Sequence, residues 1–383
     1  MTDGRIASVS FGPLRTDEFH RDPYPIYQRL RDLHPLLHDE ERDVYVITRF
    51  ADVADAARNH ASFAQDPGPD VFDRMTRMDP PRHNYWRALT AERFHPRSVA
   101  KLEAHVREVT RELLEAVLVD NVVDVVRQFA GPIPSTIVGD LIGVPREYNE
   151  RFQELSPLCI AGSPDIADAA NQEIYSLFEP LIEARRHEPK DDIISILLSG
   201  LVDGQPLTLR ELLGYCLHLV VAGNDTTTNL IGTGVYLLAT HPHVRAMLVN
   251  SPALIPQAIE EMLRYDGPVQ MLTRRMVAPV ELHGLTIPSG GLVELYWGAA
   301  NRDERQFSTP DVFDMFRSDQ RHLGFGHGVH FCLGAHLARL EARVAFEELL
   351  ARAPEYRLVE NQELTVKPGW AIRGFEQVLI ELT

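Results

Sequence analysis

Hydrophobic residues recur at helical spacing along most of the chain. This spacing predicts five long helices, over about Pro96–Val119, Asp168–His187, Leu209–Thr240, Pro256–Tyr265 and Leu333–Ala353. Shorter apolar pieces predict strands at Val44–Ile47, Val269–Val277, Val280–Ile287, Leu292–Tyr296 and Val378–Leu382. The pattern therefore predicts a mainly helical α+β fold in which small sheets are minor partners.

The most apolar of these stretches, Leu209–Thr240, could be mistaken for a membrane span. The polar segment Gly223–Asn229 lies in its middle, however, and polar side chains there are costly in lipid. We therefore expect a long buried helix with a functional notch.

Composition favours a globular enzyme-sized chain. Of its 383 residues, 44% are hydrophobic and 24% are charged, which is enough to build a large core. The 26 prolines and 24 glycines are spread along the chain without a repeat or a low-complexity linker. We therefore expect a single domain over residues 1–383.

Charge and cysteine usage restrict the class of protein further. The 38 basic and 55 acidic residues give a net charge of −17, which argues against binding nucleic acid because phosphates require a basic surface. The three cysteines have no disulfide-framework spacing, and the amino terminus opens no apolar run. These features predict a cytoplasmic protein without a signal peptide or membrane anchor.

The most informative segment surrounds Cys332. Glycines accompany this cysteine in Phe325–Gly334, and a helical pattern begins directly after it. We expect Cys332 at a helix N-terminus, where unpaired N–H groups favour a thiolate. Glycines allow the backbone to approach a flat ligand, so the segment suits a thiolate bound to haem iron. The alternative, a buried structural cysteine, is our interpretation of Cys159 and Cys216.

Phe325–Gly334 resembles the haem-thiolate loop of cytochrome P-450, Phe-x-x-Gly-x-His/Arg-x-Cys-x-Gly, with every fixed position present. The resemblance covers essentially the whole chain, and the anchorless form looks like the soluble bacterial class. It implies a triangular helical prism with haem b buried between the long central helix and the cysteine-loop helix. A β-rich lobe would come from the N-terminal segment and from about 269–297 and 370–383.

The resemblance also assigns residues around the haem. Cys332 is the expected axial ligand of the iron, within a loop that includes Phe325, Gly326 and Gly334. Donors to the two haem propionates would be His83, Arg87, Arg274 and His330. Arg275 is adjacent to Arg274, so a shift by one residue stays open, and Trp86 could add a further donor.

A buried ion network is expected to hold the cysteine loop rigid. Glu261 and Arg264 are three residues apart on one helix face, as in the Glu-x-x-Arg motif of the family. Asp311–Arg317 resembles the loop that supplies a second arginine, so Arg317 is the third expected member. Such a network fixes one geometry more than it adds net stability.

Ala222–Thr226 resembles the oxygen-side motif of the family's long central helix. We expect Gly223 to leave space for O₂, Thr226 to bond either a carbonyl one turn back or bound oxygen, and Asp225 to gate protons. Cleaving O₂ heterolytically requires two protons, which an acid–alcohol pair can deliver. The alternative is a helix with threonines bonding backward and a solvated aspartate.

The implied activity is monooxygenation, in which one atom of O₂ enters an organic substrate. Electrons would come from a separate ferredoxin or flavodoxin-type partner, since 383 residues leave no room for a reductase domain. The donor is expected to dock near Arg93, Arg97 and Lys101, and the protein is expected to be a monomer. Two alternatives stay open: a peroxide-driven hydroxylase, and a non-catalytic haem-thiolate sensor or recruitment protein.

The substrate itself is not specified by the sequence. By analogy with the family, it would contact the loop between about Gln65 and Arg77, the central helix, and the segments near residues 269–272 and 371–375. The pocket candidates are Leu219, Ala222, Val269, Gln270, Met271, Leu272 and Ile372. They are mostly apolar, with Gln270 as one polar contact, which predicts a small apolar organic substrate.

Overall fold

The computed structural model describes residues 14–66, 74–161 and 163–382. Its helices are α1 Asp17–Arg21, α2 Tyr24–Leu33, α3 Phe50–Arg58, α4 Arg82–Phe94, α5 Pro96–Ala100, α6 Glu103–Val117, α7 Pro132–Ile142, α8 Asn149–Ala161, α9 Pro164–His187, α10 Ile193–Ser199, α11 Leu209–Thr240, α12 Pro242–Asn250, α13 Ile255–Tyr265, α14 Trp297–Ala300 and α15 Ala335–Arg352. The expected mainly helical fold with small sheets is confirmed.

The strands form one larger sheet and three small ones. They are β1 Leu36–Asp39, β2 Val44–Ile47, β3 Phe63–Gln65, β4 Val122–Asp124, β5 Leu201–Val202, β6 Gln205–Pro206, β7 Leu272–Met276, β8 Val280–Leu282, β9 Leu285–Ile287, β10 Leu292–Leu295, β11 Tyr356–Leu358 and β12 Leu379–Leu382. The largest sheet has the order β1-β2-β10-β7-β3, and a second has the order β11-β12-β4. Among the strands that the structure describes, only β2 and β10 pair in parallel.

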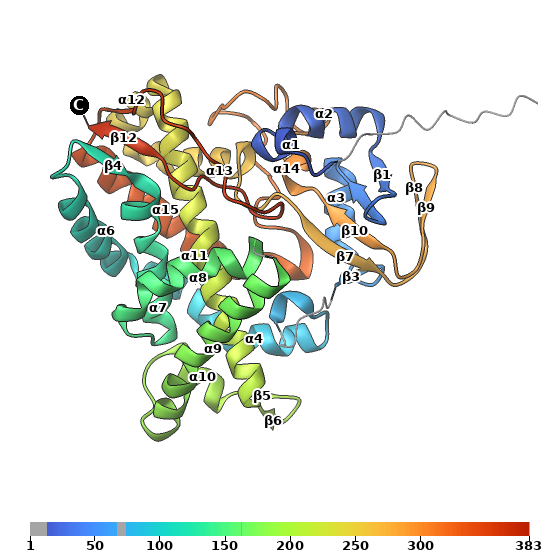
Figure 1. Cartoon of the computed structure of the whole chain (residues 1–383), viewed down its shortest axis with the longest axis horizontal. Coiled ribbons are helices and arrows are strands. Elements are labelled where there is room, and N and C mark those ends of the chain that lie inside the picture. Colours follow the sequence, from blue (N-terminus) through green and yellow to red (C-terminus); the bar gives the residue numbers. More distant parts are fainter. Residues whose placement is uncertain (1–13, 67–73, 162, 383) are drawn as a thin grey trace, which may run out of the picture.

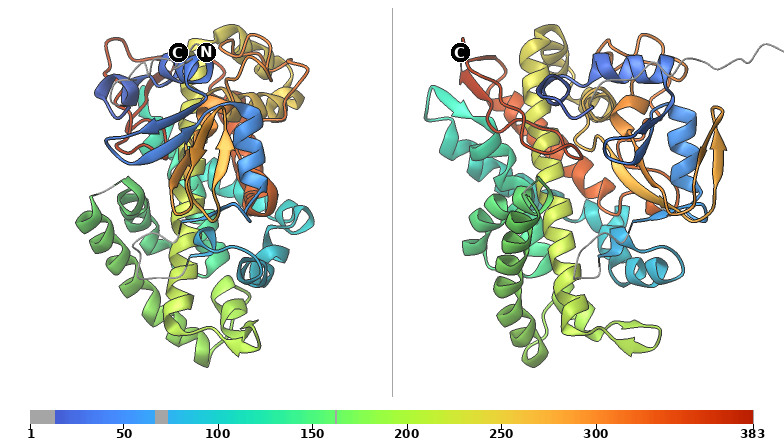
Figure 2. Two further views of the ribbon diagram at one scale, coloured as in Figure 1. Left: turned by 90° about the vertical axis from the view of Figure 1, so that its right-hand side faces the viewer. Right: turned by 45° about the vertical axis from the view of Figure 1, so that its right-hand side comes forward.

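Helix α11 is the axis of the molecule. It begins with a capping box, in which the Thr208 hydroxyl accepts from the Glu211 N–H group while the Glu211 carboxylate accepts from the Thr208 N–H group. Figures 1 and 2 show α11 running through the helical part, with the five-stranded sheet and α3 to one side. Because helices surround it, nearly all of its middle section is buried.

The structure refines several predicted boundaries. The expected helix Pro96–Val119 is two helices, since the chain turns at Lys101 and Leu102 so that Val99 and Val106 both enter the core. Val280–Ile287 is a hairpin, with His283 and Gly284 at positive φ in its turn. Among the described residues, no helix is both long enough and apolar enough to cross a membrane.

Candidate functional site

The middle of α11 has one accessible face. Between residues 212 and 235, the only positions that are not buried are His218, Ala222, Gly223 and Thr226. His218, Ala222 and Thr226 are four residues apart and therefore share one face. The expected notch is thus a short accessible stripe on an otherwise buried helix.

The oxygen-side motif has two features that bear on its expected roles. The Thr226 hydroxyl donates to the Ala222 carbonyl over 2.7 Å, as in the alternative of backward bonding. Asp225, however, is not solvated: its side chain is 5% exposed, and its Oδ1 lies 2.7 Å from the Lys367 Nζ. Asp225 and Thr226 are therefore adjacent in sequence, but the acid is buried against a lysine while the alcohol is partly accessible.

Gly223 has a packing role that the sequence did not indicate. A Cβ atom at this position would lie 2.9 Å from the Val138 Cγ2 on α7, which is too close. The absent side chain therefore lets α7 approach α11. Ala222, one position earlier, is the exposed residue of the motif.

The cysteine loop is a tight turn ahead of α15. Gly326 and Gly328 adopt positive φ angles of 72° and 73°, which side chains disfavour. The Cys332 N–H group donates to the Phe325 carbonyl over 2.9 Å and closes the turn. The helix begins at Ala335, three residues after Cys332, because Gly334 is its N-cap. The cysteine therefore precedes the helix rather than occupying its first turn.

Burial and backbone donation act in opposite directions on Cys332. Burial raises the pKa of the Cys332 thiol, whereas an N–H group from Gly334 and the charges of Arg87 and Arg339 lower it. The expected stabilisation of the thiolate by an N–H group is present, but burial outweighs it. A metal ion would reverse this balance, since a coordinating thiol loses its proton.

The ion network predicted from Glu261 is assembled in full. Glu261 accepts from Arg264 over 2.7 and 2.8 Å and from the Arg317 Nε over 3.0 Å. Both arginines also donate to backbone carbonyls, including those of Asn301 and Ser308. Because Asn301 in turn accepts from the Leu323 N–H group over 2.7 Å, the network reaches the chain just before the cysteine loop.

A second ion cluster holds Phe325, the first residue of the loop. The Arg339 guanidinium lies over its ring, 4.4 Å from the centroid, and binds Glu260 over 2.6 Å. Burial alone would raise the pKa of Glu260, but Arg339 and His322 lower it to about 2. The loop is thus anchored at its beginning by a cation that a carboxylate fixes.

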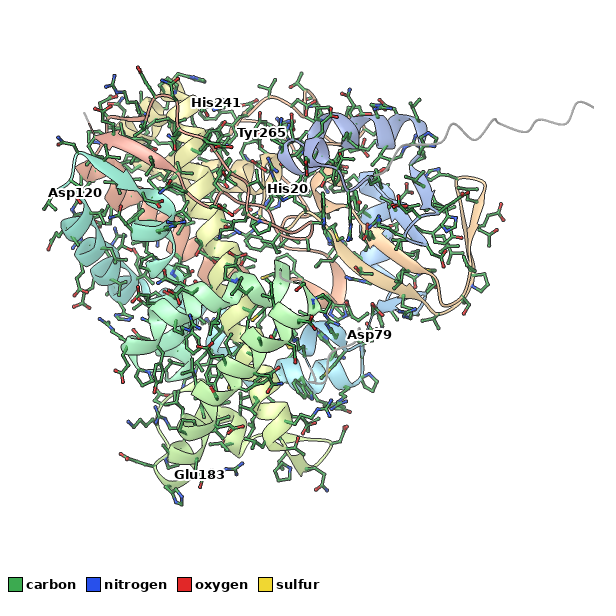
Figure 3. All side chains as sticks on the ribbon, in the orientation of Figure 1. His20, Asp79, Asp120, Glu183, His241 and Tyr265 are labelled. Atoms are coloured by element: carbon green, nitrogen blue, oxygen red, sulfur yellow. The ribbon has the colours of Figure 1, made fainter. Side chains whose placement is uncertain are left out.

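Three of the four expected propionate donors, His83, Arg274 and His330, interact with one carboxylate, Asp79, which Figure 3 labels, while the charge of Arg87 acts on His83. His330 donates to it over 3.0 Å, and the charges of His83 and Arg274 interact with it. The rings of His83 and His330 lie 4.3 Å apart. Burial, followed by the charge of His330, lowers the pKa of His83 to about 4. The sequence did not indicate Asp79, whose position shows that this donor set suits a carboxylate.

The structure distinguishes Arg274 from its neighbour. Arg274 is buried, and burial lowers its pKa to about 10. Arg275 instead binds Asp66 over 2.9 Å and donates to the Gly290 carbonyl. Only Arg274 therefore turns its charge into the interior.

These residues fit the cofactor that the loop implies. Haem b carries two carboxylates and needs one strong axial ligand, and the donor set offers both. Trp86 is fully buried, and its Nε1 has no hydrogen-bond partner among the described residues. An unused buried donor beside Arg87 is a further feature that a propionate would satisfy.

Three of the expected pocket residues point elsewhere. Gln270 is buried and bonds the Tyr27 hydroxyl over 3.0 Å and the Gly267 carbonyl over 2.8 Å, so its polar group is already used. Met271 packs in the cluster of Phe19 and Tyr27, and Leu219 packs in the helical core. His218, which the sequence analysis missed, takes the place of Leu219 on the accessible face.

The other pocket candidates stay accessible. Leu272 is 41% exposed, and Val269 forms a β-bridge with Ile372. Ala222 faces the same open stripe as Thr226. Part of the expected substrate loop, residues 67–73, lies outside the described residues.

Charge near the expected docking surface is partly neutralised. Arg93 pairs with Asp191, and Arg82 pairs with Glu211 over 3.0 Å. Arg97 and Lys101 are exposed, whereas the structure gives Arg93 an acidic partner of its own. Two of the three predicted docking residues are therefore available.

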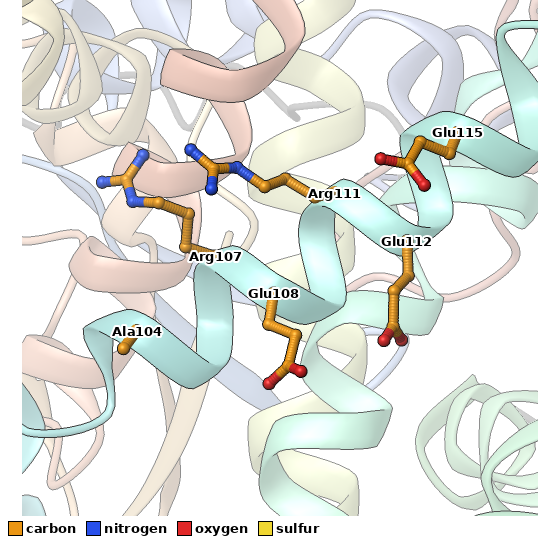
Figure 4. Close-up of a pocket in the computed structure, with 6 residues that line it drawn as sticks. All are labelled: Ala104, Arg107, Glu108, Arg111, Glu112 and Glu115. Carbon is orange, nitrogen blue, oxygen red and sulfur yellow. The ribbon is translucent and has the colours of Figure 1, made fainter.

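A hollow on α6 is a surface feature without chemistry. Figure 4 shows Arg107 and Arg111 pointing away from Glu108 and Glu112. Both arginines reach α15, where they bind Glu348 over 2.8 and 3.0 Å. These pairs join two helices and offer no site.

The cysteine lies in a glycine turn that two ion clusters hold, and near it are histidine and arginine side chains that can donate hydrogen bonds to carboxylates. This combination is typical of haem-thiolate proteins. A family model described as Cytochrome P-450 matches residues 161–251 and 250–354, and the chain belongs to this family. It is a cytochrome P-450 monooxygenase, and the resemblance found in the sequence is confirmed.

Relatives match nearly the whole chain. Cytochrome P-450 109 of Bacillus spizizenii is 35% identical over 373 residues, which cover 94% of this chain and 92% of the relative. The Vitamin D(3) 25-hydroxylase of Pseudonocardia autotrophica is 37% identical and covers 95% of this chain, with 94% of its own length matched. Both likenesses extend across helical and sheet parts.

Solved structures agree in fold. CYP109E1 from Bacillus megaterium in complex with testosterone has a TM-score of 0.92 and 32% identity, with 96% of this chain and 100% of that chain covered. The BioI cytochrome P-450 in complex with an acyl carrier protein ligated to hexadec-9Z-enoic acid has a TM-score of 0.89 and 32% identity, covering 96% of this chain and 99% of that one.

Proposed function

We propose that this enzyme inserts one atom of O₂ into an apolar organic substrate, using electrons from a separate ferredoxin or flavodoxin-type protein. The observation that carries the proposal is the accessible stripe of His218, Ala222, Gly223 and Thr226 on the buried helix α11. An accessible alcohol beside a buried acid is suited to delivering protons in oxygen chemistry.

The chain's residues have distinct roles in this proposal. Cys332 would bind the iron, and His83, Arg87, Arg274 and His330 would hold the propionates. Haem bound in this way supplies the site at which O₂ is reduced and activated. The cysteine loop would keep the thiolate in one position, because the Glu261 network and Arg339 restrain the chain where the loop begins.

Protons are supplied from the other side. Asp225 is buried next to Thr226. The Thr226 side chain lies on the accessible stripe, and its hydroxyl donates to the Ala222 carbonyl. We infer that Thr226 would donate protons on the accessible face of α11 and that Asp225 would replace them. The peroxide-driven alternative lacks support, since it has no use for this acid–alcohol pair.

The proposed substrate class is an apolar molecule of steroid size. Val269, Leu272 and Ile372 offer apolar contacts, and His218 offers one polar contact. The relatives that are named for vitamin D(3) hydroxylation or bind testosterone support this class. His218 is only partly accessible, and the protein packed around it, followed by the charges of Arg74 and His83, lowers its pKa to about 4, so its imidazole is neutral near pH 7.

The electron donor is proposed to dock around Arg97, Lys101 and Phe331. The first two are exposed cations, and Phe331, in the cysteine loop, is 39% exposed. An acidic ferredoxin would meet opposite charge there. The single domain, the monomeric state and the cytoplasmic location stay predictions.

Thr226→Ala tests the proposal. With surrogate ferredoxin, its reductase and a steroid that shifts the Soret band, we expect NADPH consumption to continue while peroxide replaces more than half of the hydroxylated product. Both product and peroxide are measured per NADPH, with Thr240→Ala at the far end of α11 as control. Unchanged coupling in Thr226→Ala, together with efficient turnover on added peroxide, would favour the peroxide-driven alternative.

A further inference from the structure

The cation beside Asp225 is a rare residue type in this chain. Of the 38 basic residues, only Lys101, Lys190 and Lys367 are lysines. Lys101 and Lys190 are exposed, but the Lys367 side chain is only 15% exposed. Its Nζ lies 2.7 Å from the Asp225 Oδ1. The one largely buried lysine therefore contacts the acid of the oxygen side.

Lys367 is fixed in place by a C-terminal hairpin. Its N–H group donates to the Gly374 carbonyl over 2.9 Å, and Val366 forms a β-bridge with Phe375. Figure 3 labels His20, whose Nε2 lies 3.0 Å from the Lys367 carbonyl oxygen. Both backbone polar groups of Lys367 are thus hydrogen-bonded, which fixes the position of its backbone.

The same hairpin packs directly on α11. A Cβ atom at Gly374 would lie 2.3 Å from the Asn229 Cγ, so only glycine permits this approach. Asn229 is one turn beyond Asp225, is 2% exposed, and has neither side-chain polar atom bonded to a described residue. Ile372, in the hairpin between Lys367 and Gly374, bridges Val269 at the proposed substrate contact.

We propose that Lys367 is the positioning residue of the proton supply: it holds the Asp225 carboxylate beside Thr226 and ties it to the substrate-side hairpin. The inference rests on the proposed function. A buried carboxylate requires a partner, and an ammonium supplies one as a compact point charge. Its three N–H groups leave donors for water after one bond to Asp225.

Other charged groups nearby are already engaged. Arg373, on the same hairpin, binds Asp266 over 3.1 Å, and His20 contacts the Lys367 backbone rather than its side chain. Glu341 interacts with Thr227 on a different face of α11. Asn229 is neutral. Lys367 is therefore the cation that the structure places against Asp225.

The ion pair can be tested without turnover. Reductive methylation of the haem-loaded protein, read by peptide mass spectrometry, compares all three lysines in one sample. We expect Lys101 and Lys190 to react at least tenfold faster than Lys367, and Asp225→Asn to accelerate Lys367 alone. Equal reaction of Lys367 in both proteins would overturn the ion pair.

The functional part of the proposal needs Lys367→Met and Lys367→Arg, with Lys190→Met as the exposed control. Lys367→Met leaves a buried carboxylate without a cation, which favours its neutral form. We expect it to move the pH profile of product formed per NADPH upward by about one unit or more, and Lys367→Arg to restore the profile. A role limited to anchoring the hairpin would raise KM for the substrate and leave the profile unchanged, which would overturn the inference.

Asp225→Asn separates the two levels of the argument. If Asp225→Asn turns over and couples like the wild type, the proposed proton role of the acid fails. If Asp225→Asn slows product formation but Lys367→Met behaves as wild type, only the inference about Lys367 fails. Support requires that Lys367→Met has no further effect when combined with Asp225→Asn.

Discussion

Two buried glutamates, one near the cysteine side of the molecule and one against the central helix α11, have very different surroundings. Glu261 on α13 and Glu341 on α15 are each 1% exposed. Glu261 accepts hydrogen bonds from Arg264, Arg317 and the Asp314 N–H group. Glu341 interacts with Thr227 of α11, and its Oε1 has no partner among the described residues.

The difference teaches that burial alone does not assign a role to an acid. Around Glu261, two cations and several carbonyls fix one arrangement, as a loop that carries a metal ligand requires. Around Glu341, burial raises the pKa to about 8, so the carboxyl is mostly neutral near pH 7. The ion pairs of Glu261 therefore hold one region rigid, while Glu341 is an acid whose protonation can change.

Cys332→Ser should have the largest effect, because it removes the thiolate and leaves the ion network intact. We expect complete loss of the red-shifted Soret band of the reduced carbon monoxide complex, with the melting temperature of the haem-free protein unchanged. Cys159→Ser and Cys216→Ser are the controls and should keep the band. A persistent band in Cys332→Ser would assign the iron ligand to another residue.

Glu261→Gln should strongly destabilise the cysteine side. It leaves Arg264 and Arg317 buried without a carboxylate, which costs about 3–5 kcal/mol when one partner of a buried pair is removed. Urea unfolding and haem retention measure this effect. The matched change Glu341→Gln removes a mostly neutral acid instead, so equal losses in the two variants would erase the distinction between the regions.

Glu341→Gln should alter how stability depends on pH. The folded-state pKa of about 8 exceeds the usual value of 4.5, so the favourable contribution is complete below about pH 4.5 and is lost as pH rises through 8. At pH 7 the difference is on the order of 3 kcal/mol. We therefore expect Glu341→Gln to lose less stability than wild type between pH 5 and 8.

That measurement is made as a difference because other groups oppose it. The pKa values of His83 and His218 are lowered to about 4, so these side chains stabilise the fold increasingly as pH rises toward 6.5. Both histidines are present in wild type and variant, and their contributions cancel. Parallel stability curves for the two proteins would show that Glu341 is already ionised.

The cysteine side could be predicted from the sequence because its signals are local. Phe325–Gly334 is contiguous, and Glu261 and Arg264 share one helical turn. The oxygen side depends on contacts that no local pattern contains. Lys367 meets Asp225 across 142 residues of sequence. The sequence analysis also left Glu341 unused, although this charged residue lies within the helical pattern after Cys332.

The direction in which the side chains of residues 269–272 point was another feature that local patterns do not contain. An apolar run such as Val269–Leu272 does not tell which side chains enter a pocket and which enter the core. Gln270 bonds Tyr27, from a helix more than 200 residues earlier, and Met271 joins the same cluster. The neighbours of this segment, rather than its composition, determine which of its residues stay accessible.

The smallest expected effect concerns the docking surface, which lies on the cysteine side yet depends on exposed charge rather than on buried pairs. Arg97→Glu combined with Lys101→Glu should slow reduction of the iron by ferredoxin several-fold, with substrate affinity unchanged. Wild-type reduction should also slow as salt rises, since screening acts over roughly 10 Å at 0.1 M. Arg93→Glu should have less effect, because Asp191 already neutralises that charge. Stopped-flow measurements of iron reduction at several salt concentrations test this prediction. Rates that are independent of salt, and equal in wild type and the double variant, would exclude this surface as the docking site. The cysteine side would then contribute to electron transfer only through the rigid loop.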